Sequence, residues 1–111
     1  MMKTTLAAAM TSLLMLSLTQ LAHADIDKGK AEKLAQEKGC TACHGIDKKI
    51  IGPAYKDVAQ KYQGNKDALA LLSKKVKDGG SGVWGPIPMP PNAGKVSDDE
   101  IKLLVEWVLA Q

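Results

Sequence analysis

The stretch Cys40-Thr41-Ala42-Cys43-His44 decides the fold of this chain, because it places two thiols and an imidazole close together in the sequence. Two cysteines that are separated by two residues and followed at once by a histidine have the spacing of covalent haem attachment sites. The thiols can add to the two vinyl groups of a haem while the imidazole reaches the iron from one face. The stretch therefore predicts one covalently bound haem c, attached to Cys40 and Cys43, with His44 as an axial iron ligand.

The same cysteines allow two other interpretations. They can form a redox disulfide, although the βαβ pattern that frames thioredoxin-like motifs is missing from the sequence. They can also bind zinc together with the histidine, but the fourth ligand would then be a carboxylate, since no second ligand pair follows. Haem attachment is the interpretation that the spacing favours.

The first residues have the features of a secretory leader. Lys3 is the only charged residue in this segment, residues 6–18 are almost entirely apolar, and Ala22-His23-Ala24 has the small-x-small pattern of a signal-peptidase site. We therefore expect residues 1–24 to be a cleaved secretory signal peptide and residues 25–111 to be a single domain. The processed protein is expected to be soluble and periplasmic, with no stable membrane anchor.

Cleavage after residue 24 would leave 87 of the 111 residues, with His44 and Met89 as the only histidine and methionine. The net charge would fall from +3 to +2, since Lys3 leaves with the leader. The remaining lysines alternate with acids and arginine is absent, so the composition gives little support to nucleic-acid binding. It fits docking to an acidic protein surface better.

Apolar residues recur at helical spacing along the processed chain, and no convincing alternating strand is present. Helices are predicted over about 27–38, ending at Gly39, and over 55–62. A third helix is expected to be capped by Asp67 and to end at Gly79-Gly80. Its buried face is expected to consist of Leu69, Leu72 and Val76.

The last helix is the most clearly marked. Ser97 and Glu100 form a capping box, and an apolar stripe with helical spacing follows it. The stripe consists of Ile101, Leu104, Val105, Val108 and Leu109. We expect it to pack on the first helix near Ala31 and Leu34, with Trp107 also in a packing role.

Residues 79–96 have a different character, because their glycines and prolines exclude a helix and a central strand. The apolar side chains of Val83, Trp84, Ile87 and Met89 distinguish them from a polar linker, so we expect an ordered loop over one face of the haem. Met89 is either a core filler or, as we favour, the second axial ligand of a His/Met pair. Trp84 either donates its indole N–H to a haem propionate or only packs.

The sequence resembles the small bacterial class I cytochromes c, and most closely their short periplasmic carriers of the five-fifty-one type. The matching segments are 39–44, 51–59, 97–100 and the run Gly82-Val83-Trp84-Gly85-Pro86-Ile87-Pro88-Met89-Pro90-Pro91-Asn92. The resemblance implies an all-α cytochrome c fold, with four to five short helices around one covalently bound haem. It also implies a cytochrome c domain over residues 25–111 that acts as a soluble periplasmic electron carrier.

The resemblance assigns haem-binding roles to four further residues, namely Pro53, Lys75, Trp84 and Asn92. It implies that the Pro53 carbonyl accepts the second ring N–H of His44, as metal-bound imidazoles usually require. It also implies that Asn92 lies near the Met89 sulfur. The resemblance further implies that Trp84 and Lys75 contact a haem propionate. The family often has arginine at the position of Lys75.

Two strong axial ligands leave no open iron position, so the predicted function is one-electron transfer and not catalysis. The resemblance suggests the cytochrome bc complex as donor and a nitrite reductase, terminal oxidase or cytochrome c peroxidase as acceptor. Lys38, Lys48, Lys49 and Lys56 either surround the haem edge and steer acidic partners or are ordinary solvated charges. A monomer is expected, since redox encounters use small interfaces. The alternative is a haem-based sensor or enzyme in which Met89 dissociates.

Overall fold

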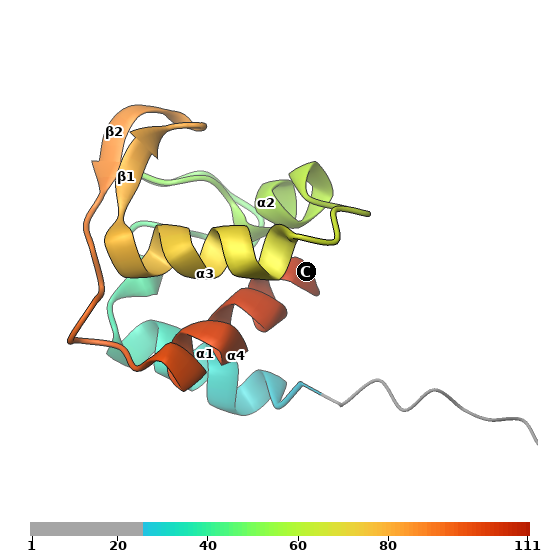
Figure 1. The fold of residues 1–111 in the computed structure, drawn as a ribbon, viewed down its shortest axis with the longest axis vertical. Helices are drawn as coiled ribbons and strands as arrows, with labels where there is room; N and C mark the ends of the chain where they lie inside the picture. Colours follow the sequence, from blue (N-terminus) through green and yellow to red (C-terminus); the bar gives the residue numbers. More distant parts are fainter. Residues whose placement is uncertain (1–25) are drawn as a thin grey trace, which may run out of the picture.

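The computed structural model describes residues 26–111, so the expected leader over residues 1–24 lies outside the described residues. The described part of the chain forms four α-helices, one 3₁₀ turn and a two-stranded sheet (Figure 1). In chain order these are α1 (Lys28–Glu37), the 3₁₀ turn (Cys40–Ala42), α2 (Tyr55–Lys61), α3 (Ala68–Asp78), β1 (Gly80–Gly82), β2 (Gly85–Met89) and α4 (Asp98–Leu109). The mostly helical fold with four to five short helices is thus confirmed. Among residues 26–111, no helix has both the length and the apolar character needed to cross a membrane.

α1 ends just before the cysteine motif. Its first turn is capped by the Asp27 carboxylate, which accepts a hydrogen bond from the backbone N–H of Lys30 at 2.9 Å. The helix ends at Glu37, and Gly39 follows in the left-handed conformation with a φ of 78°. Glycine adopts this conformation without steric cost. The chain therefore leaves the helix sharply, as predicted, and enters the 3₁₀ turn that begins at Cys40.

α4 is the central helix, since α1, α2 and α3 all pack against it. Its predicted capping box is present: Glu100 N–H donates to Ser97 Oγ at 3.2 Å, and Ser97 N–H donates to Glu100 Oε1 at 3.0 Å. Trp107 is buried and meets the Tyr55 ring edge-to-face, with 5.3 Å between the centroids. The core cluster that joins α4 to α1 includes Ala31, Leu34, Ala35, Ile101, Leu104 and Val105. The expected packing of the first and last helices is confirmed.

α3 differs from the prediction at its start. Asp67 occupies the N-cap position, but its side chain makes no capping hydrogen bond. Its backbone N–H instead donates to Oδ1 of Asn65 at 2.9 Å, so the Asn65 side chain closes this turn. The expected buried face of the helix is only partly covered by protein. Leu72 and Val76 are half-buried because they line the cavity described below.

Residues 79–96 are ordered, as expected, and contain neither a helix nor a central strand, but they include a strand pair that was not predicted. β1 and β2 form an antiparallel hairpin that pairs Gly80 with Met89 and Gly82 with Gly85. Gly82 and Gly85 have φ values of 113° and 114°, which lie outside the ordinary strand region. The prolines are tolerated because a two-stranded sheet consists only of edges. Because the strands consist mainly of glycine and proline, they lack the alternation of apolar and polar residues by which a strand is predicted.

Candidate functional site

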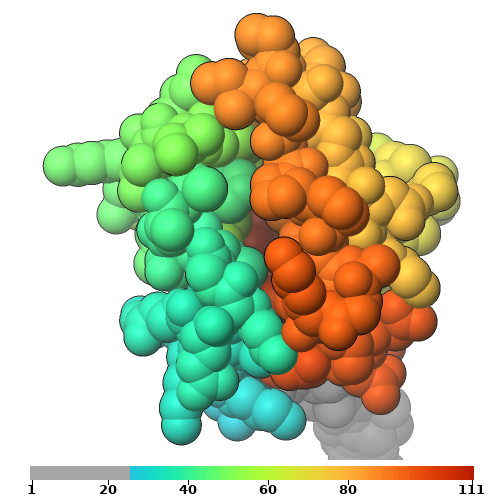
Figure 2. Space-filling model, turned by 90° about the vertical axis from the view of Figure 1, so that its left-hand side faces the viewer, coloured from blue at the N-terminus to red at the C-terminus, as the bar shows by residue number. Residues whose placement is uncertain are grey.

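A cavity of about 320 Å³ lies between the segment that carries the cysteine motif and the hairpin. Figure 2 shows its mouth as a furrow between the chain around residues 40–60 and the chain around residues 80–95. Its walls are almost entirely apolar, and α4 contributes Leu104, Val105 and Val108 to them. The volume falls in the range of sites that hold cofactors.

His44 is fixed on one side of the cavity by three neighbours. Its Nδ1–H donates to the carbonyl of Pro53 at 2.8 Å, which leaves Nε2 with a lone pair for a metal. Tyr55 stacks on the imidazole, with 5.1 Å between the centroids and 18° between the planes. Behind the ring lies Gly52, where a Cβ would come within 2.5 Å of Cε1. The predicted Pro53 contact is therefore present, and the imidazole has little room to move.

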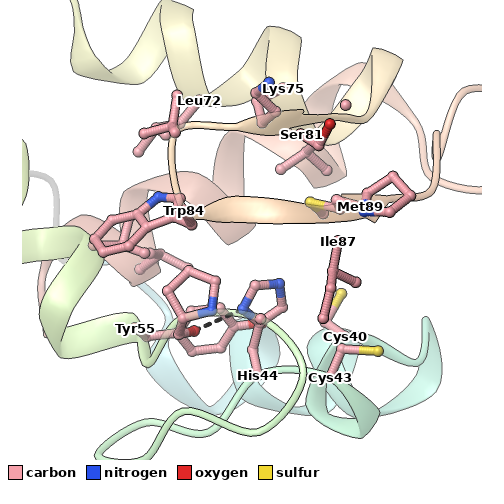
Figure 3. A pocket seen from close by; sticks show the side chains of 18 of the residues that line it. Cys40, Cys43, His44, Tyr55, Leu72, Lys75, Ser81, Trp84, Ile87 and Met89 are labelled. Carbon is pink, nitrogen blue, oxygen red and sulfur yellow. Dashed lines mark hydrogen bonds between the residues drawn. The ribbon is translucent and has the colours of Figure 1, made fainter.

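Cys40 and Cys43 lie together at one end of the cavity (Figure 3). The 3₁₀ turn brings them there, since the backbone N–H groups of both Cys43 and His44 donate to the Cys40 carbonyl. Both thiols are free and half-buried. Burial raises the pKa of the Cys40 thiol above its ordinary value. Residues 26–111 contain no cluster of three or more His, Cys, Asp or Glu side chains suited to a metal ion.

Met89 faces the cavity from the side opposite His44, with its sulfur directed inward (Figure 3). It ends β2, and its carbonyl packs so closely on Gly79 that a Cβ there would collide with it. The loop that follows is tied to α3 by Asn92, whose Nδ2 donates to the Val76 carbonyl at 3.0 Å and to the Pro90 carbonyl at 3.3 Å. Asn92 does not line the cavity. The expected contact between Asn92 and the Met89 sulfur stays a prediction.

Trp84 and Lys75 also line the cavity. Trp84 lies at the end away from the two cysteines, whereas Lys75 approaches from α3 (Figure 3). The Trp84 side chain is 41% exposed, so it contacts both the cavity and the solvent. Lys61, at the end of α2, places its Nζ 5.5 Å from the centroid of the Trp84 ring.

Four residues that shape this site were not predicted as site residues, namely Gly52, Tyr55, Gly79 and Lys61. The two glycines act through the missing Cβ, and a glycine before a proline, as at Gly52, is equally consistent with an ordinary turn. Lys61 has no sequence signal, because its partner lies across the cavity.

Cys40, Cys43, His44 and Met89 carry rare or reactive side chains, which is why their roles could be predicted from the residues themselves. The roles of Pro53, Lys75 and Asn92 came only from the resemblance to a family.

The residues around the cavity fit a haem c. Apolar walls suit the faces of a porphyrin, paired thiols at one end suit two thioether bonds, and a nitrogen and a sulfur ligand face each other across the space. Lys75 and Trp84 add one cation and one N–H donor, which suit carboxylate groups. Among residues 26–111, no acidic side chain lines the cavity.

Comparison with known proteins agrees with a covalently bound haem c. The family described as Cytochrome c matches residues 26–111. Cytochrome c-551 of Pseudomonas aeruginosa is 60% identical over 80 residues, which cover 72% of this chain and 75% of that protein. Cytochrome c-552 of Hydrogenobacter thermophilus is 56% identical over 79 residues, which cover 71% of this chain and 79% of that protein. The crystal structure of wild-type Nitrosomonas europaea cytochrome c552 superposes with a TM-score of 0.68 at 49% identity, covering 71% of this chain and 96% of that one.

Proposed function

The chain belongs to the cytochrome c family, and from that premise we propose that it carries single electrons between periplasmic redox proteins, with His44 and Met89 as its axial ligands. It is an electron carrier and not an enzyme, and its cofactor is one haem c bound covalently through the motif at Cys40 and Cys43. The bound haem supplies a one-electron Fe(II)/Fe(III) couple. The proposal takes residues 25–111 as the working domain and residues 1–24 as the exported leader.

One observation carries the assignment of the axial ligands. The His44 ring and the Met89 sulfur face each other across the cavity whose end holds both thiols (Figure 3). The Pro53 carbonyl fixes the tautomer of the imidazole. The close packing of the Met89 carbonyl on Gly79 fixes the backbone of the methionine. Held in this way, His44 and Met89 would bind the iron from both sides, and the haem would then supply one-electron exchange without a position for a substrate.

The Met89 assignment is tested with Met89→Ala in the holoprotein. Loss of the thioether should abolish the weak near-infrared sulfur-to-iron band and lower the reduction potential, since a methionine ligand raises it. Ile87→Ala is the matched control, because Ile87 lines the same cavity from the same strand and cannot bind iron. The control should keep the band. A band that survives Met89→Ala would remove Met89 from the coordination sphere.

Trp84 and Lys75 are proposed to bind the haem carboxylates. The position of Trp84, at the cavity end away from Cys40 and Cys43, supports this role (Figure 3). Lys75 offers a compact point charge, where an arginine would offer a planar fork with two parallel donors. We therefore expect a single hydrogen bond from this ammonium group.

The proposed partners are acidic redox proteins. Lys48 and Lys49 lie in the loop after the motif and belong to none of the ion pairs found in residues 26–111. Lys56 pairs with Asp47, so its net contribution to a docking surface is smaller. Ile50, which is 54% exposed between these lysines and the cavity-lining segment, offers apolar contact area to a small interface.

This charge pattern favours a protein that steers its partners electrostatically. The cytochrome bc complex is the proposed donor, and a nitrite reductase, terminal oxidase or cytochrome c peroxidase is the proposed acceptor. The carrier itself is proposed to be monomeric.

The steering proposal is tested by the salt dependence of the bimolecular electron-transfer rate. We expect the rate with an acidic partner to fall as ionic strength rises. The double variant Lys48→Glu with Lys49→Glu should flatten this dependence. Charge reversal at Lys28 and Lys66 is the matched control, because both lysines are exposed, lie outside the cavity walls and the motif loop, and belong to none of the ion pairs found in residues 26–111. A rate that is independent of salt in the parent protein would contradict steering.

A further inference from the structure

The contact between Lys61 and Trp84 joins two elements on opposite sides of the cavity mouth. Lys61 is the last residue of α2, and Trp84 stands in the turn between β1 and β2. The 5.5 Å between the ammonium nitrogen and the ring centroid is within the range of a cation–π interaction. Lys61 belongs to none of the ion pairs found in residues 26–111, so no carboxylate competes for its charge.

The hairpin is anchored at its base and exposed at its tip. At the base, the backbone N–H of Asn92 donates to the carbonyls at the end of α3, and Gly79 packs on Met89. The strands pack mainly on each other, whereas the helices pack together around α4. At the tip, the Val83 and Trp84 side chains are 51% and 41% exposed.

No hydrogen bond or ion pair within residues 26–111 ties this tip to a helix. The ammonium of Lys61 is the polar contact that reaches it. Within the polypeptide the hairpin is therefore anchored at its base, and a contact at the far end opposes rotation about that base most effectively.

We propose that Lys61 is a positioning residue that holds the hairpin closed over the cavity through its contact with the Trp84 ring. β2 begins beside Trp84 and ends at Met89, so the contact restrains the strand that carries the sulfur. This last consequence rests on the proposed function, which makes Met89 an iron ligand. Closure of the hairpin itself does not depend on that assignment.

The test is amide hydrogen exchange of the holoprotein at neutral pH, with Lys61→Met, Lys61→Arg and Lys66→Met compared with the parent. Lys61→Met keeps an apolar stem but removes the cation, so exchange of the protected amides between Gly80 and Met89 should accelerate about two- to five-fold, the factor expected for loss of an exposed cation–π contact. Lys61→Arg keeps a cation that stacks on indole and should restore the parent rate. Lys66→Met makes the same charge change in the turn after α2 and should have no effect.

The expected acceleration is confined to the hairpin, and exchange in α1 and α4 should not change. An unchanged hairpin in Lys61→Met would overturn the proposal, and so would uniform acceleration along the chain or failure of arginine to restore the parent rate. The near-infrared band of each variant is recorded as well. Absence of that band from the parent protein would reject the Met89 assignment and leave the hairpin comparison intact, so the two failures are distinguishable.

Discussion

At the scale of single residues, Gly52 shows how tightly the axial histidine is enclosed. A Cβ at this position would lie 2.5 Å from Cε1 and 2.8 Å from Nδ1 of the His44 ring. Gly52→Ala must therefore displace the ring or the backbone, and overpacking of this kind costs about 1–3 kcal/mol. We expect the denaturant midpoint of the holoprotein to fall accordingly, as measured by circular dichroism.

Gly29→Ala is the matched control for this clash. Gly29 lies in α1, where the nearest atom to a Cβ is Oδ1 of Asp27 at 3.7 Å. Alanine is also a better helix former than glycine. The control should be neutral or slightly stabilising. Equal losses in the two variants would show that the effect comes from glycine replacement in general and not from the His44 ring.

These residues also show what sequence reasoning can find. Cys40, Cys43 and His44 could be predicted because their spacing matches one kind of chemistry, and Met89 because it is the only thioether beyond the expected leader. Gly52 and Lys61 could not, since each acts through a neighbour that only the folded chain brings close. The chemistry of a side chain can be read from the sequence, whereas the contacts made by close packing can be read only from the folded chain.

At the scale of secondary-structure elements, the capping box of α4 makes the free energy of unfolding depend on pH in the acidic range. The hydrogen bond from the Ser97 backbone N–H holds the pKa of the Glu100 carboxyl below its ordinary value. A lowered pKa in the folded state contributes stability above the ordinary pKa, and this contribution is lost as pH falls through the lowered value. Glu100→Gln should therefore flatten the acid side of the profile of unfolding free energy against pH.

Asp99→Asn is the control for this profile. Asp99 lies in the same first turn of α4, but its side chain makes none of the side-chain hydrogen bonds or ion pairs found in residues 26–111. It tests whether any carboxylate near the helix N-terminus has the same effect through the helix dipole. Similar flattening in both variants would assign the acid dependence to the dipole and not to the capping box.

The elements differ in how far the sequence predicted them. α1 and α4 each have a capping residue in the sequence and apolar residues at helical spacing. The local signal for the helix end and the pattern of the buried face therefore predict the same helix. At the start of α3, Asp67 and Asn65 are both suited to capping, and pattern alone could not choose between them. The hairpin was missed because its strands consist mainly of glycine and proline, whose structural roles depend on pairing with the other strand.

At the scale of the whole molecule, the core is divided by the cavity. The core cluster joins α1 to α4, whereas Leu72 and Val76 of α3 line the cavity. Across it, Ile51 and Ile87 are more than half exposed, although both line the cavity wall. Much of the apolar surface of this small domain therefore depends on the haem for its burial.

The chain without haem is consequently expected to be mostly unfolded. Without haem, the apolar walls of the cavity of about 320 Å³ stay in contact with water, so their burial contributes nothing to the free energy of folding. Domains are only marginally stable, with unfolding free energies of about 5–15 kcal/mol, and a small domain that loses this contribution has little stability left. Protein produced without haem should therefore show weak helical circular dichroism and no cooperative thermal transition, whereas the holoprotein in the same buffer should show both. A cooperative, helix-rich transition of the haem-free chain would mean that the α1–α4 cluster is sufficient for folding.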